Sequence, residues 1–400
     1  MDTDSLVELR RELHRHPEPG WCEFYTTARV VEAVERVGVD ELHIGPDAID
    51  PDARMAVPDE ETIAAHGERA REAGADPALI DAMAGGHTGA VATLDRGDGP
   101  TVALRVDIDA LPIEESDDPD HRPAAEEFRS GRDGWMHACG HDAHATLGVG
   151  VLDAVARSEF SGTLKVFFQP AEERIGGGRA VAESGHLDGV DHLLAVHVGL
   201  DHPTGEVVAG VDEFLAVRHF EAAFEGASAH AGARPNEGRN AVQAVAAAVE
   251  GLYGIPRHEE GPTRVNAGVV EGGTASNIVP AAARIEGECR GGTTALAEYV
   301  ADRAEGVLQS AADMHGCDLD LDWGARAPGG ESDDELRSVV ADVAGRTAGV
   351  DSVVDSDALG GSEDATYLME RVQQGGGTAA YVCVGTDHPG GHHTPTFDVD

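Results

Sequence analysis

The chain has 400 residues, 41% of them hydrophobic, which is enough material for two domains with separate cores. It carries 29 basic and 74 acidic side chains, a net charge of -45, which excludes nucleic acid and anionic membranes as general partners. Excess carboxylate with Lys165 as the single lysine is typical of halophilic proteins, because molar salt screens the self-repulsion of such a chain.

The cysteines are few and scattered, and they form a poor disulfide framework, so a reducing compartment is favoured. They are Cys22, Cys139, Cys289, Cys317 and Cys383. The first residues are acidic and do not resemble a signal peptide, and apolar runs such as 193–198 are too short to cross a bilayer. We expect a soluble cytoplasmic protein.

The N-terminal third begins with helical patterns. Capping-box spacing predicts a helix from Ser5 to about His16, and a second helix is predicted over 26–37, with Gly38 as its stop. The stretch 45–90 is rich in Asp and Ala, contains a short helical pattern, and shows no recognisable chemistry.

Further along, buried strands alternate with helical patterns. The strands are predicted over about 102–106, 163–168, 193–196 and 379–384, with helices that include 143–157 and 335–347. This order predicts an α/β fold with a mostly parallel, mixed sheet flanked by helices. Polar residues follow each strand, and ligands of such sheets bind beyond the carboxyl ends of the strands, so we expect these side chains to converge.

The stretch 136–144 places a thiol, three imidazoles and a carboxylate within nine residues. Cys139 and His141 are ligand types suited to zinc, and the intervening Gly140 lets both side chains face one point. The alternative is a polar loop with a buried free thiol. Ligand-type residues at the other strand ends favour a site for two divalent metal ions, zinc or manganese.

Residues 214–326 interrupt the alternating pattern with a βαββα order and a closing strand, which predicts an inserted two-layer α+β domain. The first domain is then discontinuous and comprises 1–213 and 327–400. Near the turns of the insert lie His230, Asn277 and Arg290, for which an ordinary role in turns is the alternative.

Several motifs together resemble the aminoacylase-type dinuclear metallopeptidase superfamily, in the amidohydrolase branch that holds hippurate hydrolase and indoleacetyl-amino acid hydrolases. They are HRHPE (14–18), DIDALP (107–112), HACGHD (137–142), EE (172–173), AVHV (195–198), SAHAG (228–232), GSED (361–364) and HTP (393–395). The resemblance extends in order over nearly the whole chain and implies a zinc-exopeptidase-like fold. Residues 51–90, 117–123 and 391–395 are most similar to aminobenzoyl-glutamate hydrolases.

The resemblance implies a role for each matched residue. Cys139, His141, Glu173, His197 and His393 are implied as metal ligands, Glu172 as general base, Asp109 as a residue behind the ligands, and His230, Asn277 and Arg290 as substrate-handling residues. His393 is preferred over His392 because it directly precedes Thr-Pro. In the resembled family a helix follows this tail, whereas this chain ends at Asp400, so the packing around His393 is an open point.

The resemblance also implies a reaction and partners. The expected activity is hydrolysis of the amide bond of N-acyl or N-aroyl amino acids, with aminobenzoyl-glutamate among the candidates. The inserted domain is expected to act as a lid and to form a homodimer, in which His230 completes the partner's site, or to pair with a related second subunit. A cysteine hydrolase that uses Cys139, and a non-catalytic binding protein that retains the fold, are the two alternatives.

Overall fold

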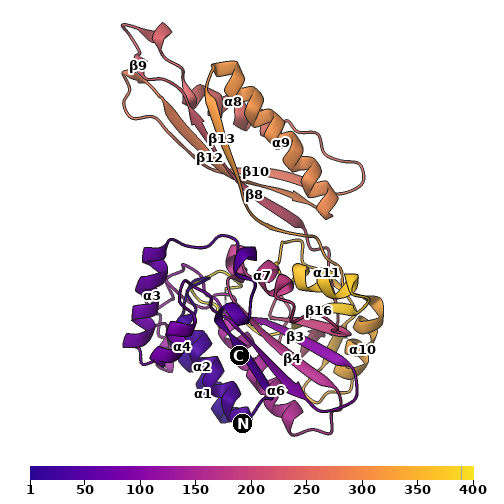
Figure 1. Cartoon of the computed structure of the whole chain (residues 1–400). Helices are drawn as coiled ribbons and strands as arrows, with labels where there is room; N and C mark the ends of the chain where they lie inside the picture. Colours follow the sequence, from indigo (N-terminus) through magenta and orange to yellow (C-terminus); the bar gives the residue numbers. More distant parts are fainter. Residues whose placement is uncertain (389) are drawn as a thin grey trace. The chain divides into compact units, whose positions relative to one another are not determined.

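The computed structural model describes residues 1–388 and 390–400, which form two compact units. The first unit contains Met1–Asp212, Glu331–Leu359 and Glu363–Asp400, and the second contains Glu213–Gly330 with Gly360–Ser362 (Figure 1). The sequence did not indicate that Gly360–Ser362 belongs with the second unit. Among the described residues, no helix is long and apolar enough to cross a membrane.

An eight-stranded mixed sheet forms the centre of the first unit, in the order β1-β2-β4-β3-β5-β16-β6-β14. The bounds are β1 (Glu41–Ile44), β2 (Ala90–Asp95), β3 (Thr101–Asp107), β4 (Thr163–Gln169), β5 (His192–Val198), β6 (Glu206–Val208), β14 (Ser352–Val354) and β16 (Thr378–Val384). The middle strands β4, β3, β5 and β16 are parallel, and they contain the four predicted strands. The predicted α/β class is confirmed, but the antiparallel edge strands β1 and β2 were not predicted.

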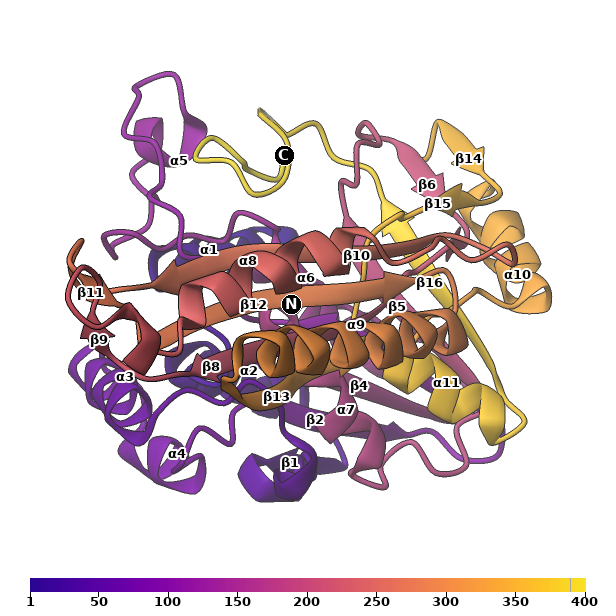
Figure 2. The same cartoon turned by 90° about the horizontal axis from the view of Figure 1, so that it is seen from above.

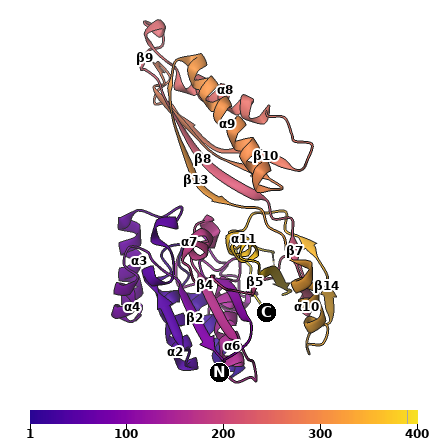
Figure 3. The same ribbon diagram turned by 45° about the vertical axis from the view of Figure 1, so that its right-hand side comes forward.

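Helices cover both faces of this sheet (Figure 3). The helices of this unit are α1 (Thr3–Arg15), α2 (Phe24–Val37), α3 (Glu60–Glu72), α4 (Pro77–Ala82), α5 (Arg122–Ala125), α6 (His141–Ala156), α7 (Gly178–Glu183), α10 (Asp334–Ala344) and α11 (Thr366–Gln374). Apolar side chains of α1, α2 and α6 pack with Leu104, Val106 and Val166 in one core. Because neighbouring residues of a strand face opposite sides, Arg105 points to the other face, where it meets the residues before α11.

The start of α1 corrects the predicted capping box. The helix begins at Thr3 rather than Ser5, because the Asp2 carboxylate accepts a hydrogen bond from the Ser5 backbone N–H at 2.9 Å. An acidic cap is also favoured by the positive end of the helix dipole.

The second unit is a four-stranded antiparallel sheet in the order β10-β12-β8-β13, with two helices on one face (Figure 2). The elements are β8 (Ala216–Glu225), α8 (Ala241–Tyr253), β10 (Thr263–Gly272), β12 (Ala282–Gly291), α9 (Thr294–His315) and β13 (Asp318–Ala327). Two short ribbons complete the chain: β9 (Ala229–His230) pairs with β11 (Ile278–Val279), and β7 (Val211–Asp212) pairs with β15 (Asp357–Ala358). The roles of the two units as catalytic and lid domains remain predictions.

Candidate metal centre and active site

A tight turn at the start of α6 presents Cys139 and His141. Gly140 between them has φ +85°, and a Cβ at this position would lie 2.6 Å from Val198 Cγ2. Only glycine therefore fits, because any other side chain combines a strained backbone with a steric clash. Both flanking side chains are buried, with exposures of 8% for Cys139 and 1% for His141.

His197, near the end of β5, faces the thiol of Cys139. Its Nε2 lies 3.4 Å from Sγ, while its Nδ1 hydrogen bonds to the carbonyl oxygen of Val198 at 2.7 Å. A carbonyl oxygen only accepts, so Nδ1 carries the proton and the lone pair of Nε2 points toward Cys139. This is the tautomer that a metal-binding imidazole requires.

Two further buried residues, Asp107 and His144, border the same turn. Nδ1 of His144 hydrogen bonds to Asp107, and its Nε2 accepts from the backbone N–H of Val198 at 2.9 Å. Asp107 Oδ1 also lies 3.5 Å from Nε2 of His141. No role was predicted for either residue, although both belong to motifs that the sequence showed.

Glu172 and Glu173 occupy a strained turn after β4. The residues on either side, Ala171 and Ile175, have φ of 57° and 52°, which is unusual for residues with a Cβ. Asp109 holds this turn, since its carboxylate oxygens accept the backbone N–H groups of Glu172 and Glu173, each at 3.1 Å. Oδ1 of Asp109 also lies 3.3 Å from Nδ1 of His141, so one carboxylate contacts both segments.

His393 approaches from the C-terminal tail. Its backbone N–H donates to the carbonyl of Ala138 at 2.9 Å, and its Nε2 lies 3.7 Å from Oε1 of Glu173. His392 instead uses its Nε2 to contact the carbonyl oxygen of Val198 at 3.1 Å. Of this histidine pair, His393 is the one grouped with Cys139 and Glu173.

Among the groups of donor atoms that the described residues form, each with its atoms within 4.8 Å of one another, two overlap at Cys139. One group is Cys139, His141 and His197, and the other is Cys139, Glu173 and His393. Nε2 of His141 and Oε1 of Glu173 are buried without a hydrogen-bond partner. Buried polar atoms are costly without partners, so these lone pairs and the mixed sulfur, nitrogen and oxygen donors fit a bound cation.

Burial and mutual repulsion disfavour the negative charges at this cluster. Burial, with further repulsion from Glu173 and Glu172, raises the pKa of the Cys139 thiol well above its ordinary value. Burial also raises the pKa of Glu172 well above its usual range and that of Glu173 to about 8. A cysteine nucleophile needs a lowered thiol pKa, so this environment disfavours the cysteine-hydrolase alternative, whereas a cation would offset the repulsion.

Behind the cluster, Arg105 is fully buried and pairs with three carboxylates. Its guanidinium lies 2.7 Å from Asp107, 3.0 Å from Glu363 and 3.3 Å from Asp364. Burial alone would lower the pKa of Arg105, but these carboxylates raise it well above its ordinary value. Carboxylate oxygens of Asp107 and Glu363 lie within 4.8 Å of a carboxylate oxygen of Glu172. Arg105 therefore holds in place two side chains that lie beside Glu172. Sequence reasoning missed Arg105, because a charged residue inside an apolar strand pattern gives no signal of its partners.

The second unit brings two of the three predicted substrate residues together. His230 and Asn277 lie on the paired ends of β9 and β11, where the backbone N–H of Ala231 donates to the Asn277 carbonyl at 2.9 Å. Nδ1 of His230 accepts the backbone N–H groups of Gly232 at 3.1 Å and Ala233 at 3.0 Å, so Nε2 carries the proton of the neutral ring. The exposed His230 side chain therefore presents a donor.

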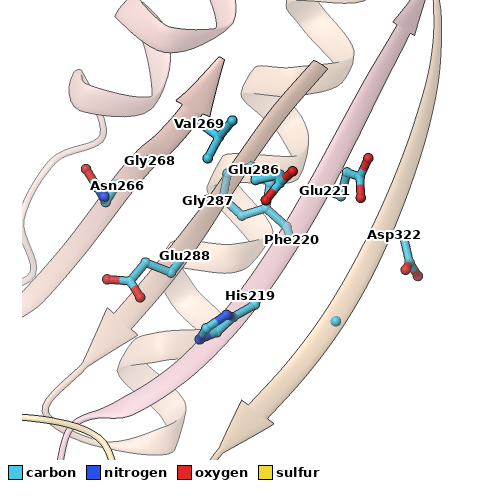
Figure 4. Close-up of a pocket in the computed structure, with 11 residues that line it drawn as sticks. His219, Phe220, Glu221, Asn266, Gly268, Val269, Glu286, Gly287, Glu288 and Asp322 are labelled. Atoms are coloured by element: carbon cyan, nitrogen blue, oxygen red, sulfur yellow. The ribbon is translucent and has the colours of Figure 1, made fainter. Parts of the chain in front are cut away.

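Arg290 lies elsewhere in this unit. It sits near the far end of β12, roughly 26 Å along the strand from Ala282 at about 3.3 Å per residue. Glu288 binds its guanidinium in bidentate fashion at 2.8 and 2.9 Å, and Nη1 donates to Ser362 at 3.0 Å. Glu288 also lines a hollow of about 360 Å³ on the sheet, together with His219 and Asn266, and none of the three predicted substrate residues lines it (Figure 4).

The chain that gathers these Cys, His and Glu donors is similar over its length to hydrolases that act on amide bonds. The family model described as Peptidase family M20/M25/M40 matches residues 103–400, and the chain belongs to this family. The predicted family and the predicted amide-bond hydrolysis are thereby confirmed.

Two relatives are similar over almost the entire chain. Indole-3-acetyl-aspartic acid hydrolase of Enterobacter agglomerans is 43% identical, covering 99% of this chain and 92% of the relative. One subunit of the p-aminobenzoyl-glutamate hydrolase of Escherichia coli is 42% identical with the same coverage.

Two solved structures share the fold. An aminobenzoyl-glutamate utilization protein from Klebsiella pneumoniae has a TM-score of 0.84 and 40% identity, covering 96% of this chain and 91% of that chain. A dinuclear metal binding peptidase of the M20 family from Bacillus subtilis has a TM-score of 0.69 and 26% identity, covering 99% and 92%.

Proposed function

We propose that this chain hydrolyses the amide bond of N-acyl or N-aroyl amino acids, and that aminobenzoyl-glutamate is the first substrate to test. The observation that carries the proposal is the cluster of donor atoms from Cys139, His141, His197, Glu173 and His393 beside Glu172. The names of the two relatives support the substrate class, since both describe an aromatic acyl group joined to an acidic amino acid.

The five donor residues would hold two divalent ions, zinc or manganese. The thiolate of Cys139 favours zinc, whereas the mixed carboxylate and imidazole set also suits manganese. When bound, such ions polarise a substrate carbonyl and make water a stronger acid. Asp109 would hold the imidazole of His141 and the turn that carries Glu173 in a fixed position relative to each other, because its carboxylate contacts both.

Glu172 would act as the general base. Its exposure is only 9%, and it shares a donor group with His141 and Glu173, so it faces the place where the ions would lie. It accepts a proton from the attacking water and returns it to the nitrogen of the leaving amine. Without a cation, burial and the neighbouring carboxylates raise the pKa of Glu172 well above its ordinary value and favour its protonated form, so a bound cation would be what returns it to the carboxylate that acts as a base.

The second unit would complete the substrate site. The Nε2–H of His230 is free to donate to the oxyanion of the tetrahedral intermediate, with Asn277 beside it. Arg290 would bind the carboxylate of the amino acid. Without substrate, the carboxylate of Glu288 binds the guanidinium of Arg290 instead.

We propose a homodimer through the second unit, in which His230 serves the partner's site; pairing with a related second subunit is the other arrangement. The name of the Escherichia coli relative, which describes one of the subunits of a hydrolase, supports the second arrangement. Mixing inactive Glu172→Gln chains with inactive His230→Ala chains tests sharing, because only a shared site regains activity in a mixed dimer. Demonstrated mixed dimers without activity would show that His230 does not act in the partner.

Adjacent substitutions test the proposed base. Glu172→Gln should leave the metal content near wild type and reduce turnover of aminobenzoyl-glutamate by about 10²–10⁴-fold. The matched variant Glu173→Gln should instead lose metal, because Glu173 carries the unpartnered donor atom. Near-normal turnover by Glu172→Gln would show that another group takes the proton.

The proposed setting is a reducing, salt-rich cytoplasm. All five cysteines are buried and unpaired, which supports a reducing compartment. The net charge of -45 supports high salt.

A further inference from the structure

Arg10 on α1 pairs with two carboxylates from distant parts of the chain, Asp142 and Asp398. Its Nε lies 2.8 Å from Oδ2 of Asp142, and its Nη2 lies 2.5 Å from Oδ1 of Asp398. All three side chains are buried, with exposures of 9%, 0% and 4% for the residues in that order. The guanidinium of Arg10 lies between these two buried carboxylates, and His14 also pairs with Asp142 at 2.9 Å.

Each carboxylate belongs to a segment that carries candidate metal ligands. Asp142 follows His141 directly in the first turn of α6, whereas Asp398 lies in the tail that carries His393. Arg10 therefore joins the two segments that must come together for the group of Cys139, Glu173 and His393 to form.

His393 depends on how the tail is held. Its side chain is 56% exposed, and its backbone has φ +58°, so the imidazole is not clamped in the way that His141 and His197 are. The tail is held by Phe397, which packs on Met136 and Ala138, and by Asp398, which Arg122 also binds at 2.6 Å. Arg10 also binds Asp398, and it pairs in addition with Asp142 of α6.

We propose that Arg10 is a positioning residue, which sets the C-terminal tail against α6 and so assembles the ligand group that contains His393. The inference rests on the proposed metal centre. An arginine suits this place because its planar guanidinium donates to Asp398 and also lies within ion-pair distance of Asp142, whereas a lysine offers a single point charge. Loss of a partner behind a metal ligand typically weakens metal binding by about 10–100-fold.

Arg10→Met and Asp398→Asn test the proposal, with Arg11→Met as the matched control. Arg11 is the next residue on α1 and forms an ion pair with Glu126 at the surface. Equilibrium dialysis against zinc or manganese, followed by metal analysis, should give two ions per wild-type or Arg11→Met chain. Arg10→Met and Asp398→Asn should keep one ion and bind the second about 10–100-fold more weakly. Hydrogen exchange of residues 390–400 should rise in these two variants, while circular dichroism stays native.

The possible outcomes separate this inference from the proposed function. If wild-type chains do not bind two ions, the proposed metal centre is wrong, and so is this inference. Wild-type affinity for both ions in folded Arg10→Met and Asp398→Asn would overturn the role of Arg10 alone. Equal loss of both ions would also overturn it, because Arg10 would then support the whole site rather than the tail. If Arg10→Met does not fold, Asp398→Asn is compared with Arg122→Met, which removes the other arginine partner of Asp398 and leaves Arg10 in place. Equal affinity for the second ion in these two variants would overturn the role of Arg10.

Discussion

Replacing Arg105 by Met removes the guanidinium that pairs with three buried carboxylates of the first unit. Methionine fills much of the same volume, so the change deletes charge and hydrogen bonds more than packing. Asp107, Glu363 and Asp364 then lose contacts of 2.7, 3.0 and 3.3 Å at exposures of 5% or less for their side chains. We expect a folded but weakened protein.

The magnitude follows from burial. Breaking a buried ion pair on one side typically costs about 3–5 kcal/mol, because the remaining charge stays uncompensated. The cost should depend on pH. Burial and Glu363 already raise the pKa of Asp364 to about 8, even though Arg105 lowers it, and without Arg105 this pKa rises further. A carboxyl group whose pKa is raised in the folded state stabilises the fold at low pH and loses that contribution as pH rises. The free-energy loss of the variant should therefore be smaller at pH 5 than at pH 8.

Urea unfolding in a Trp323→Phe background measures this loss, because the remaining tryptophans, Trp21 and Trp135, both lie in the first unit. Arg337→Met is the matched control: this arginine pairs with Asp212 at 2.7 Å, but its other carboxylate partners are largely exposed. The control should lose about 1 kcal/mol or less. If Arg105→Met lost no more than the control at pH 8, the reasoning from buried charge would be refuted.

Three further predictions concern metal, pH and salt. Cys139→Ser and His197→Ala should each lower the metal content measured by elemental analysis, and wild-type metal content in both variants would contradict the ligand set. Added zinc or manganese should restore the activity of wild-type protein that a chelator has inactivated. Burial lowers the pKa of His14, but Asp142 and Glu115 raise it to about 9, so its contribution of about 3 kcal/mol is present below pH 6.5 and lost as pH rises through 9. Between pH 6 and pH 9.5, the free energy of unfolding measured in urea should fall by about 3 kcal/mol more in wild type than in His14→Gln. With a net charge of -45, the melting temperature should be higher in about 3 M than in about 0.1 M KCl, and equal values would exclude dependence on salt.

The sequence by itself determined the parts that depend on local pattern. Apolar runs predicted the four parallel strands, because a strand buried on both faces shows itself as a continuous apolar segment. The polar residues after those strands predicted a shared site, since parallel strands end at the same edge of a sheet. Gly140 marked the turn between Cys139 and His141, because its backbone conformation excludes other residues.

Only the tertiary structure decided which side chains meet across long separations in the chain. Arg105 pairs with Glu363 and Asp364, and Arg10 pairs with Asp398, although no sequence spacing links these residues. It also separated Arg290 from His230 and Asn277, because strand β12 extends away from the β9–β11 ribbon. The periodicity of the sequence shows which face of its own strand or helix a residue occupies. It does not show which residue supplies the opposite charge to a buried side chain, because the fold brings that residue alongside from another segment.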